Sequence, residues 1–189
     1  LLAWTALSAD EEMAALYARP TLDAIVACQV CAPGNPLHGG IPQRVSKKHT
    51  DGRYFPFYIA RCVPALLQGA THFDEERYQV AAQAAVAFLL HHQLADGSFP
   101  QVVYANGRTN RYPQWIAGVG DILRAMDLVG APEGDVARKV TLNWLLAGLQ
   151  GSSPRTAHGF GAQISQAKPP ALPDFRDMMA VVGWADKAF

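Results

Sequence analysis

The sequence has few cysteines, little charge and no long hydrophobic run, and each of these features narrows the class of protein. Cysteine occurs 3 times in 189 residues. An odd number in a chain of this size argues against a disulfide framework and favours a reducing compartment, so we expect a cytoplasmic protein. No apolar stretch reaches the ~18–20 residues that cross a bilayer, and the first residues lack the basic flank of a signal peptide. The formal net charge is zero, so no basic excess points to nucleic acid.

Charged residues make up only 17% of the chain, whereas half of it is hydrophobic. These proportions suit one domain with a substantial core, or a domain whose surface is covered by further protein. Strand signals are nearly absent, and residues 101–104 are the one short candidate. Cys28-x-x-Cys31 has no second cysteine pair and falls at the end of a predicted helix. We therefore interpret these cysteines as packing residues and predict no metal and no cofactor.

A short motif recurs along the chain. The run Gly39-Gly40-Ile41-Pro42-Gln43 returns as Gly97-Ser98-Phe99-Pro100-Gln101 and, more weakly, as residues 159–163. Each copy follows a predicted helical segment that ends in Gln, at 22–29, 77–93 and 137–150. Each copy also precedes a segment opened by Pro-x-aromatic. Gly ends a helix without strain, and Pro is favoured in a first turn. The pattern predicts three helical hairpins, at about 20–70, 76–128 and 133–189. The second helices are predicted to begin near Pro56, Pro113 and Pro173, with Tyr58, Trp115 and Phe175 in equivalent places.

The middle copy resembles a known repeat. Phe88-Leu89-x-x-x-Gln93-x-x-x-Gly97-x-Phe99 is similar to the Gln–aromatic repeat of squalene and hopene cyclases, which also occurs loosely in protein prenyltransferases. Phe stands here where those cyclases usually have Trp. The resemblance implies an all-α fold of helical hairpins in an α/α toroid, an architecture shared with many polysaccharide lyases and glycosidases. It implies a fold superclass and not a reaction. Three hairpins do not close such a ring, so we expect a single repeat domain that is part of a longer toroid, or one that partners or further copies complete.

Candidate ligand-binding residues lie in the loops that enter the second helix of each hairpin, which line one mouth of a toroid. These loops, at 43–55, 101–112 and 163–172, hold seven basic residues against Asp51 in a chain of zero net charge. A basic mouth attracts anions, and aromatic rings beside Arg suit sugars that carry carboxylate or sulfate. The alternative is that the loops are simply solvated. We predict an anionic glycan or other small anion as ligand, bound by Arg44, Arg53, Tyr54, Arg108 and Trp115.

The densest polar stretch, at 106–112, supplies candidate catalytic residues. A polysaccharide lyase neutralises a uronate carboxylate and needs a base and an acid. Asn110, Arg111 and Tyr112, with His158 or His49, could fill those roles. The same residues could instead form turns, with Tyr112 packed on the next helix. A glycosidase needs two carboxylates; the pair that shares a helix face at the third unit, Asp174 and Asp177, also suits helix capping.

Three functional hypotheses stay open, and whether the chain is an enzyme is not decided. The first is a toroid that binds or acts on an anionic glycan, and the second is a non-catalytic helical scaffold within a larger protein. The third is an enzyme of the isoprenoid cyclase or prenyltransferase kind. The basic mouth favours the first hypothesis over the third. The acidic Asp-x-Asp-Asp and Asp-Asp-x-x-Asp motifs of isoprenoid enzymes are absent, and the absence of catalytic motifs favours the scaffold over both other hypotheses.

Overall fold

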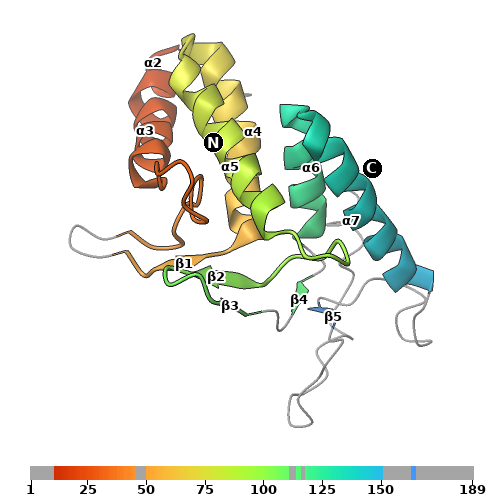
Figure 1. The fold of residues 1–189 in the computed structure, drawn as a ribbon. Helices are drawn as coiled ribbons and strands as arrows, with labels where there is room; N and C mark the ends of the chain where they lie inside the picture. Colours follow the sequence, from red (N-terminus) through yellow and green to blue (C-terminus); the bar gives the residue numbers. More distant parts are fainter. Residues whose placement is uncertain (1–10, 46–49, 111–113, 116–117, 151–162, 165–189) are drawn as a thin grey trace.

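The computed structural model describes residues 11–45, 50–110, 114–115, 118–150 and 163–164. These residues are mostly helical, as predicted, and the helices stand side by side with small strands across one end (Figure 1). No helix among them is long and apolar enough to cross a membrane. The helical elements are α2 (Glu11–Met13), the π-helix η1 (Ala14–Ala18), α3 (Arg19–Cys28), α4 (Pro56–Phe73), α5 (Glu76–His92), α6 (Val119–Val129) and α7 (Pro132–Gln150).

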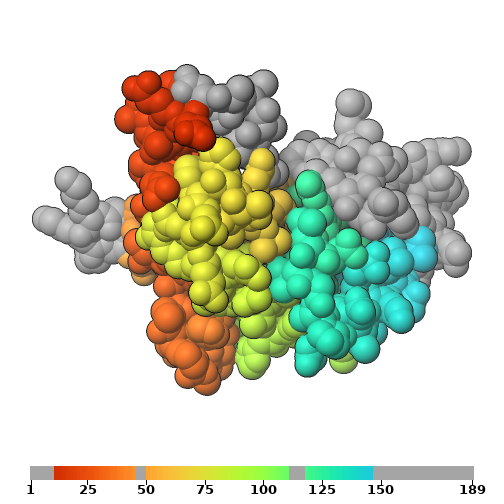
Figure 2. All heavy atoms as spheres, turned by 90° about the horizontal axis from the view of Figure 1, so that it is seen from above, coloured from red at the N-terminus to blue at the C-terminus, as the bar shows by residue number. Residues whose placement is uncertain are grey.

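The helices pack in two rows. Helix α5 contacts α3 on one side and α7 on the other, and we call these three the outer row. Helices α4 and α6 pack on each other as the inner row, and α5 packs on both of them. Viewed from above, the described segments follow one another in sequence order across the molecule (Figure 2). The core lies between the rows, and its fully buried side chains include Leu22, Leu66, Tyr78, Phe88, Leu89 and Met126.

Several helix boundaries follow from local chemistry. Pro56 is the first residue of α4, as predicted. The N–H groups in the first turn of a helix have no partner within the helix, so proline, which lacks this group, is tolerated there. The residue that follows each helix has a left-handed conformation: Asp74 after α4 has φ 52°, and Gly130 after α6 has φ 65°. Helix α5 lies within one residue of the predicted segment 77–93. The third predicted segment, 137–150, forms the greater part of α7.

The prediction for the start of the second inner helix is wrong. Trp115 belongs to a short strand, and α6 begins only at Val119, so Trp115 and Tyr58 do not occupy equivalent places. The backbone of residues 114–115 is committed to strand pairing with residues 163–164. The helix then starts after Gly118, where an added Cβ would lie 2.3 Å from the Cβ of Phe57. A glycine there lets the start of α6 approach α4. Pro113, Pro173 and Phe175 lie outside the described residues.

The strands form two small antiparallel units. The first has the order β1 (Arg53–Tyr54), β2 (Val102–Tyr104) and β3 (Thr109–Asn110). The second pairs β4 (Gln114–Trp115) with β5 (Gln163–Ile164). Strand β2 confirms the one strand that the sequence predicted. Because β1 leads into α4 and β3 precedes α6, the three-stranded sheet lies at the N-terminal end of the inner helices (Figure 1).

Candidate functional site

Strand pairing joins the first two predicted mouth loops and connects the third to the segment that follows the second loop. Strand β1 comes from the first loop, and β2 and β3 come from the second. Arg53 lies opposite Tyr104, and Tyr54 lies opposite Val103. Strand β5, the first two residues of the third loop, pairs with residues that follow the second loop. Segments far apart in the sequence therefore meet at one end of the helices.

Two arginines flank a tyrosine on one face of the sheet. Arg53 and Tyr104 are cross-strand partners, and the amide of Tyr104 donates to the carbonyl of Arg108 at 2.8 Å. Side chains directly opposite each other in antiparallel strands share a face. Arg53, Tyr104 and Arg108 thus form a row across the sheet, and Asn110 lies on the same face by alternation. All four side chains are half-buried or exposed, so the row is accessible from outside.

Asp51 holds the first arginine of the row. Its carboxylate accepts from Arg53 Nε at 3.3 Å and from the Arg53 backbone amide at 3.2 Å. The ion pair uses one edge of the guanidinium, which has five N–H donors in all. Arg44 lies in the neighbouring segment, where its carbonyl accepts from the Asp51 amide at 3.2 Å. The acid of the loop thus holds one edge of the Arg53 guanidinium in place.

A hollow of about 420 Å³ opens beside the row. The β2–β3 hairpin lines it, and its turn is formed by Asn106 and Gly107, the latter with φ 78°. The Asn106 side chain accepts from the Arg108 amide at 3.1 Å, which fixes the position where Arg108 enters β3. A phenol, two amides, a hydroxyl and a guanidinium therefore line the hollow; its described lining residues are Tyr104, Asn106, Arg108, Thr109 and Asn110.

The Tyr54 side chain does not lie on this face. It was predicted to contact a ligand, but it is 5% exposed and its ring packs 6.1 Å from that of Phe88. Alternation along β1 explains the difference, because Arg53 faces outward and the next residue must face the core. Burial, followed by the negative charge of Asp51, raises the pKa of Tyr54.

The remaining predicted residues are placed in part or not at all. Asn110 is in β3, beside the hollow, and only the backbone of Trp115 is described, in β4. The other candidates and the remaining basic residues of the predicted loops lie outside the described residues: Lys47, Lys48, His49, Arg111, Tyr112, His158, Lys168, Asp174 and Asp177.

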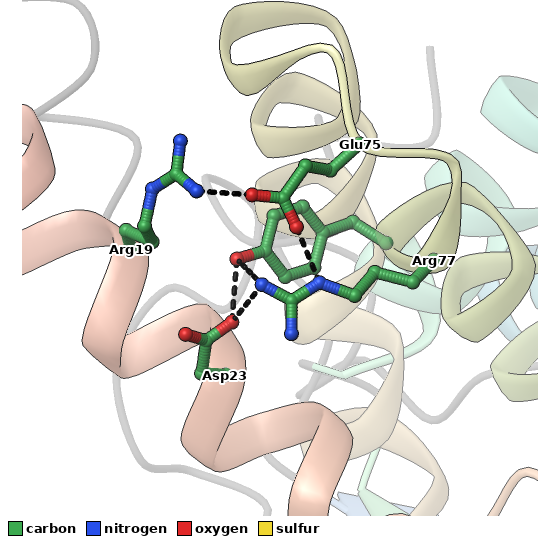
Figure 3. Close-up of polar contacts among 5 residues, drawn as sticks. Arg19, Asp23, Glu75 and Arg77 are labelled. Carbon is green, nitrogen blue, oxygen red and sulfur yellow. Dashed lines mark hydrogen bonds and ion pairs between the residues drawn. The ribbon is translucent and has the colours of Figure 1, made fainter.

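A second polar cluster, which the sequence did not suggest, joins the outer helices at the far end from the sheet (Figures 1 and 3). Arg77 binds Asp23 at 2.7 Å and also pairs with Glu75, which in turn pairs with Arg19. The hydroxyl of the fully buried Tyr78 donates to Asp23 at 2.6 Å. Burial, and then the bond to Asp23, raises the pKa of Tyr78 to about 12.

One inner-row ion pair joins α4 to α6. Arg61 Nε lies 2.7 Å from Asp121, whose side chain is only 8% exposed. The Arg61 guanidinium also lies over the ring of Tyr58 at 5.6 Å. Like the cluster at the far end, this pair connects residues that only the tertiary structure brings together, and both clusters connect helices rather than open onto the sheet face.

The glutamines of the sequence repeat connect neighbouring outer helices. Gln29 Nε2 donates to the carbonyl of Ala81 in α5 at 2.9 Å and to that of Gly39 at 3.0 Å. Gln93 Nε2 donates to the carbonyl of Ala137 in α7 and to the Thr141 hydroxyl, both at 2.7 Å. In both described units, the glutamine that follows one outer helix thus binds the next outer helix.

The glycines of the same motif lie against the same helices. An added Cβ at Gly39 would be 1.8 Å from the carbonyl oxygen of Ala84, and one at Gly97 would be 2.5 Å from that of Val140. Both glycines have positive φ, 83° and 89°. Each turn therefore packs its backbone directly on the following helix, which requires a residue without a side chain.

The three cysteines are free thiols; Cys28 and Cys62 are partly buried and Cys31 is exposed. Cys28 Sγ donates to the carbonyl of Ile25 at 3.2 Å, at the end of α3. Burial raises the pKa of Cys28 and raises that of Cys62 to about 11. Both thiols therefore stay protonated at neutral pH, which disfavours them as nucleophiles or metal ligands.

In comparisons with known proteins, no family model matches the chain, and no curated protein or solved structure matches it.

Proposed function

We propose that the outward face of the three-stranded sheet binds an anionic glycan. The observation that carries this proposal is the row Arg53–Tyr104–Arg108, which strand pairing assembles from two loops. A single basic loop is commonly just solvated, but two loops hydrogen-bonded so that their arginines flank an aromatic ring make a ligand surface. Guanidinium pairs bidentately with carboxylate and sulfate, and the tyrosine ring offers a face to a sugar.

The spacing of the row suggests the form of the ligand. Neighbouring strands lie about 4.8 Å apart, so the two arginines are separated by about 10 Å at the backbone with Tyr104 between them. A sugar ring over Tyr104, with acidic groups on either side of it, fits this arrangement. The amide of Asn106, close to Arg108, would bind hydroxyl groups. A uronate or sulfated oligosaccharide has these groups, whereas a neutral glycan would offer no anion to Arg108 or to the edge of Arg53 that Asp51 does not bind.

The proposal concerns binding, and a lyase-like reaction is its extension. No carboxylate is among the described residues that line the hollow, so the paired acids of a glycosidase find no support there. A lyase would use Asn110, Arg111, Tyr112 and His158, of which Asn110 is the described member. A reaction would appear as formation of an unsaturated uronate, which absorbs in the ultraviolet.

We further propose that the chain is part of an α/α toroid built from helical hairpins. In support, Gln29 and Gln93 make corresponding contacts with the next outer helix, and Gly39 and Gly97 pack on that helix in the same way. The two-row packing of the helices is also what such hairpins require. The loops that enter the inner helices would then lie together at one mouth.

A non-catalytic scaffold is the second candidate, and one observation favours it. The repeated Gln and Gly residues are engaged in helix–helix contacts, so the motif itself serves assembly and not chemistry. A scaffold would need no ligand at the sheet, and titration with glycans therefore separates the two candidates. The isoprenoid hypothesis keeps one favourable feature, since a diphosphate is also an anion.

The test is calorimetric titration of the protein with oligogalacturonate, a sulfated oligosaccharide, a neutral oligosaccharide and an isoprenoid diphosphate. We expect the charged glycans to bind more tightly than the neutral one, and to bind more weakly as salt rises. Arg108→Ala should lower the affinity by about 1–3 kcal/mol, as expected for a lost charge-assisted hydrogen bond. Arg124→Ala is the matched control, because Arg124 is exposed on α6.

Equal affinity for neutral and charged glycans would reject the electrostatic basis of the proposal. Tighter binding of the diphosphate would favour the isoprenoid hypothesis instead. Failure of all four ligands to bind would leave the scaffold as the better interpretation of the chain.

A further inference from the structure

The two arginines of the row differ in their acidic partners. Arg53 is paired with Asp51, whose carboxylate lies 3.3 Å from its Nε. Arg108 is exposed, and in the part of the chain that the structure describes no carboxylate pairs with it. The row is therefore unequal: the Arg108 end carries an uncompensated positive charge, whereas the Arg53 end carries an ion pair.

Asp51 is held at the sheet by its own backbone as well as by its side chain. Its amide donates to the carbonyl of Arg44 at 3.2 Å, and its carboxylate accepts from the Arg53 amide at 3.2 Å. The carbonyl of the next residue, Gly52, accepts from the Ala105 amide of the neighbouring loop at 2.8 Å. The Asp51 side chain is 16% exposed. A ligand that binds the other edge of Arg53 therefore meets a carboxylate that is fixed in place.

A second anion at Arg53 would be opposed by this carboxylate. Two like charges about 4 Å apart repel enough to lower an affinity by about fivefold even at the dielectric constant of water. A ligand hydroxyl could accept from the same N–H groups of Arg53 without that repulsion. At Arg108 the repulsion is missing, so an acidic group there keeps the full strength of a charge-assisted hydrogen bond.

The neighbour of Arg53 on its other side is also suited to a hydroxyl. The amide of Gln43 donates to the Arg53 carbonyl at 2.9 Å, which places Gln43 next to Arg53. The Gln43 side chain is exposed, and its amide group can both donate and accept a hydrogen bond. Arg53 thus has a neutral hydrogen-bonding group beside it, in addition to the fixed carboxylate.

We infer that Asp51 is a specificity-determining residue, which makes the row select a glycan with an acidic sugar beside Arg108 and a neutral sugar beside Arg53. The inference rests on the proposed function and narrows its ligand class. An acid beside Arg53 is accommodated, but it adds little affinity. A glycan in which acidic and neutral sugars adjoin should therefore bind about as tightly as one that is acidic throughout.

The experiment is a calorimetric cycle with the full chain and two trisaccharides. One trisaccharide has a uronate at both ends, the other has a uronate at one end, and the remaining sugars are neutral. Asp51→Asn removes the charge and keeps an oxygen that can accept from the Arg53 amide. The gain in affinity from the second uronate should be about fivefold larger in Asp51→Asn than in the wild type. The charge of Arg44 is the same in all four measurements and cancels.

Asp74→Asn is the matched control, because it removes the same charge from an exposed residue at the opposite end of α4. Asparagine also tolerates the left-handed conformation of that residue. The 18 residues of α4 span about 27 Å, well beyond the screening length of roughly 8–10 Å. The second uronate should therefore give Asp74→Asn the same gain as the wild type. Circular dichroism of each variant establishes that the fold is retained.

Two arginine variants test where the acid of the ligand lies. With the trisaccharide that has one uronate, Arg108→Ala should lower the affinity by about tenfold or more, as expected for a lost bond to a charged group. Arg53→Ala should lower it by a smaller factor, because a hydroxyl is the group expected there. A larger loss in Arg53→Ala than in Arg108→Ala would overturn the inference.

An equal gain from the second uronate in the wild type and in Asp51→Asn would also overturn it. That result includes the case in which Asp51 has a structural role alone, since both trisaccharides would then change in affinity by the same factor. In either case the proposed function stands, because the trisaccharides still bind. If neither trisaccharide binds the wild type, the proposed function fails and the inference fails with it.

Discussion

The close approach of the glycine turns to the next helix can be tested by comparing two glycines that share a backbone conformation. Gly39 and Gly107 have φ of 83° and 78°, so alanine is strained at both. Adopting the left-handed conformation costs a non-glycine residue about 1–2 kcal/mol. Around Gly107 nothing lies within 4 Å of an added Cβ, so Gly107→Ala should lose about that amount of unfolding free energy and no more.

Gly39→Ala should lose more unfolding free energy than Gly107→Ala. Its Cβ would lie 1.8 Å from the carbonyl oxygen of Ala84, a distance that must grow to at least 3.0 Å. The turn would have to withdraw from α5, and the bonds of Gln29 to Ala81 and Gly39 would lengthen or break. Two lost hydrogen bonds cost about 0.5–1.5 kcal/mol each, which with the backbone strain gives a total of about 2–5 kcal/mol.

The assay is urea unfolding followed by circular dichroism, with all three proteins compared at one temperature. Gly97→Ala serves as a replicate in the second unit, where the carbonyl oxygen of Val140 would be 2.5 Å away. Equal losses for Gly39→Ala and Gly107→Ala would refute the reasoning, because the contact with α5 would then contribute nothing beyond the turn conformation.

Two further predictions concern polar groups between elements. Tyr78→Phe keeps the buried ring and removes the hydroxyl that donates to Asp23 at 2.6 Å; we expect a loss of about 1–2 kcal/mol in urea unfolding, and an unchanged midpoint would contradict it. His92 binds the carbonyl of Pro36 at 2.9 Å, and burial lowers its pKa. Folding thus favours the neutral form of His92. The contribution of this residue to the free energy of unfolding is complete above the unfolded pKa of about 6.5, and it is lost as the pH falls below that value. In thermal unfolding between pH 7.5 and 5, the melting temperature of the wild type should fall more steeply with pH than that of His92→Gln. Equal slopes for the two proteins would exclude His92 as the cause.

The sequence predicted what local chemistry determines. Proline at the first turn located the start of α4, and helical periodicity located α5 to within a residue. The β2 strand was also found, because residues 101–104 have the one strand-like pattern in the chain. The start of α6 was missed, since pairing of β4 with β5 overrides the helix signal of the proline and that pairing is between distant residues.

The candidate site was predictable only as a set of residues. The basic loops were evident from charge, but the union of the first two loops in one sheet depends on the register of Arg53 with Tyr104. That register also decides that Arg53 faces outward and Tyr54 inward, which composition could not reveal. The Asp23–Tyr78 bond and the Arg61–Asp121 pair were missed for the same reason. No local pattern identifies partners so far apart in the chain.

The Gln–Gly turns also affect how the protein unfolds. Each of the two described turns follows one outer helix but binds the next outer helix, so neither turn can open without removing a contact from that helix. Helix α5 takes part in two such contacts, as the receiver of Gln29 and as the helix that precedes Gln93. Such nearest-neighbour coupling makes unfolding cooperative along the outer row. Within the described residues, unfolding of α5 would therefore remove turn contacts with both α3 and α7, whereas unfolding of α3 would remove those with α5 alone.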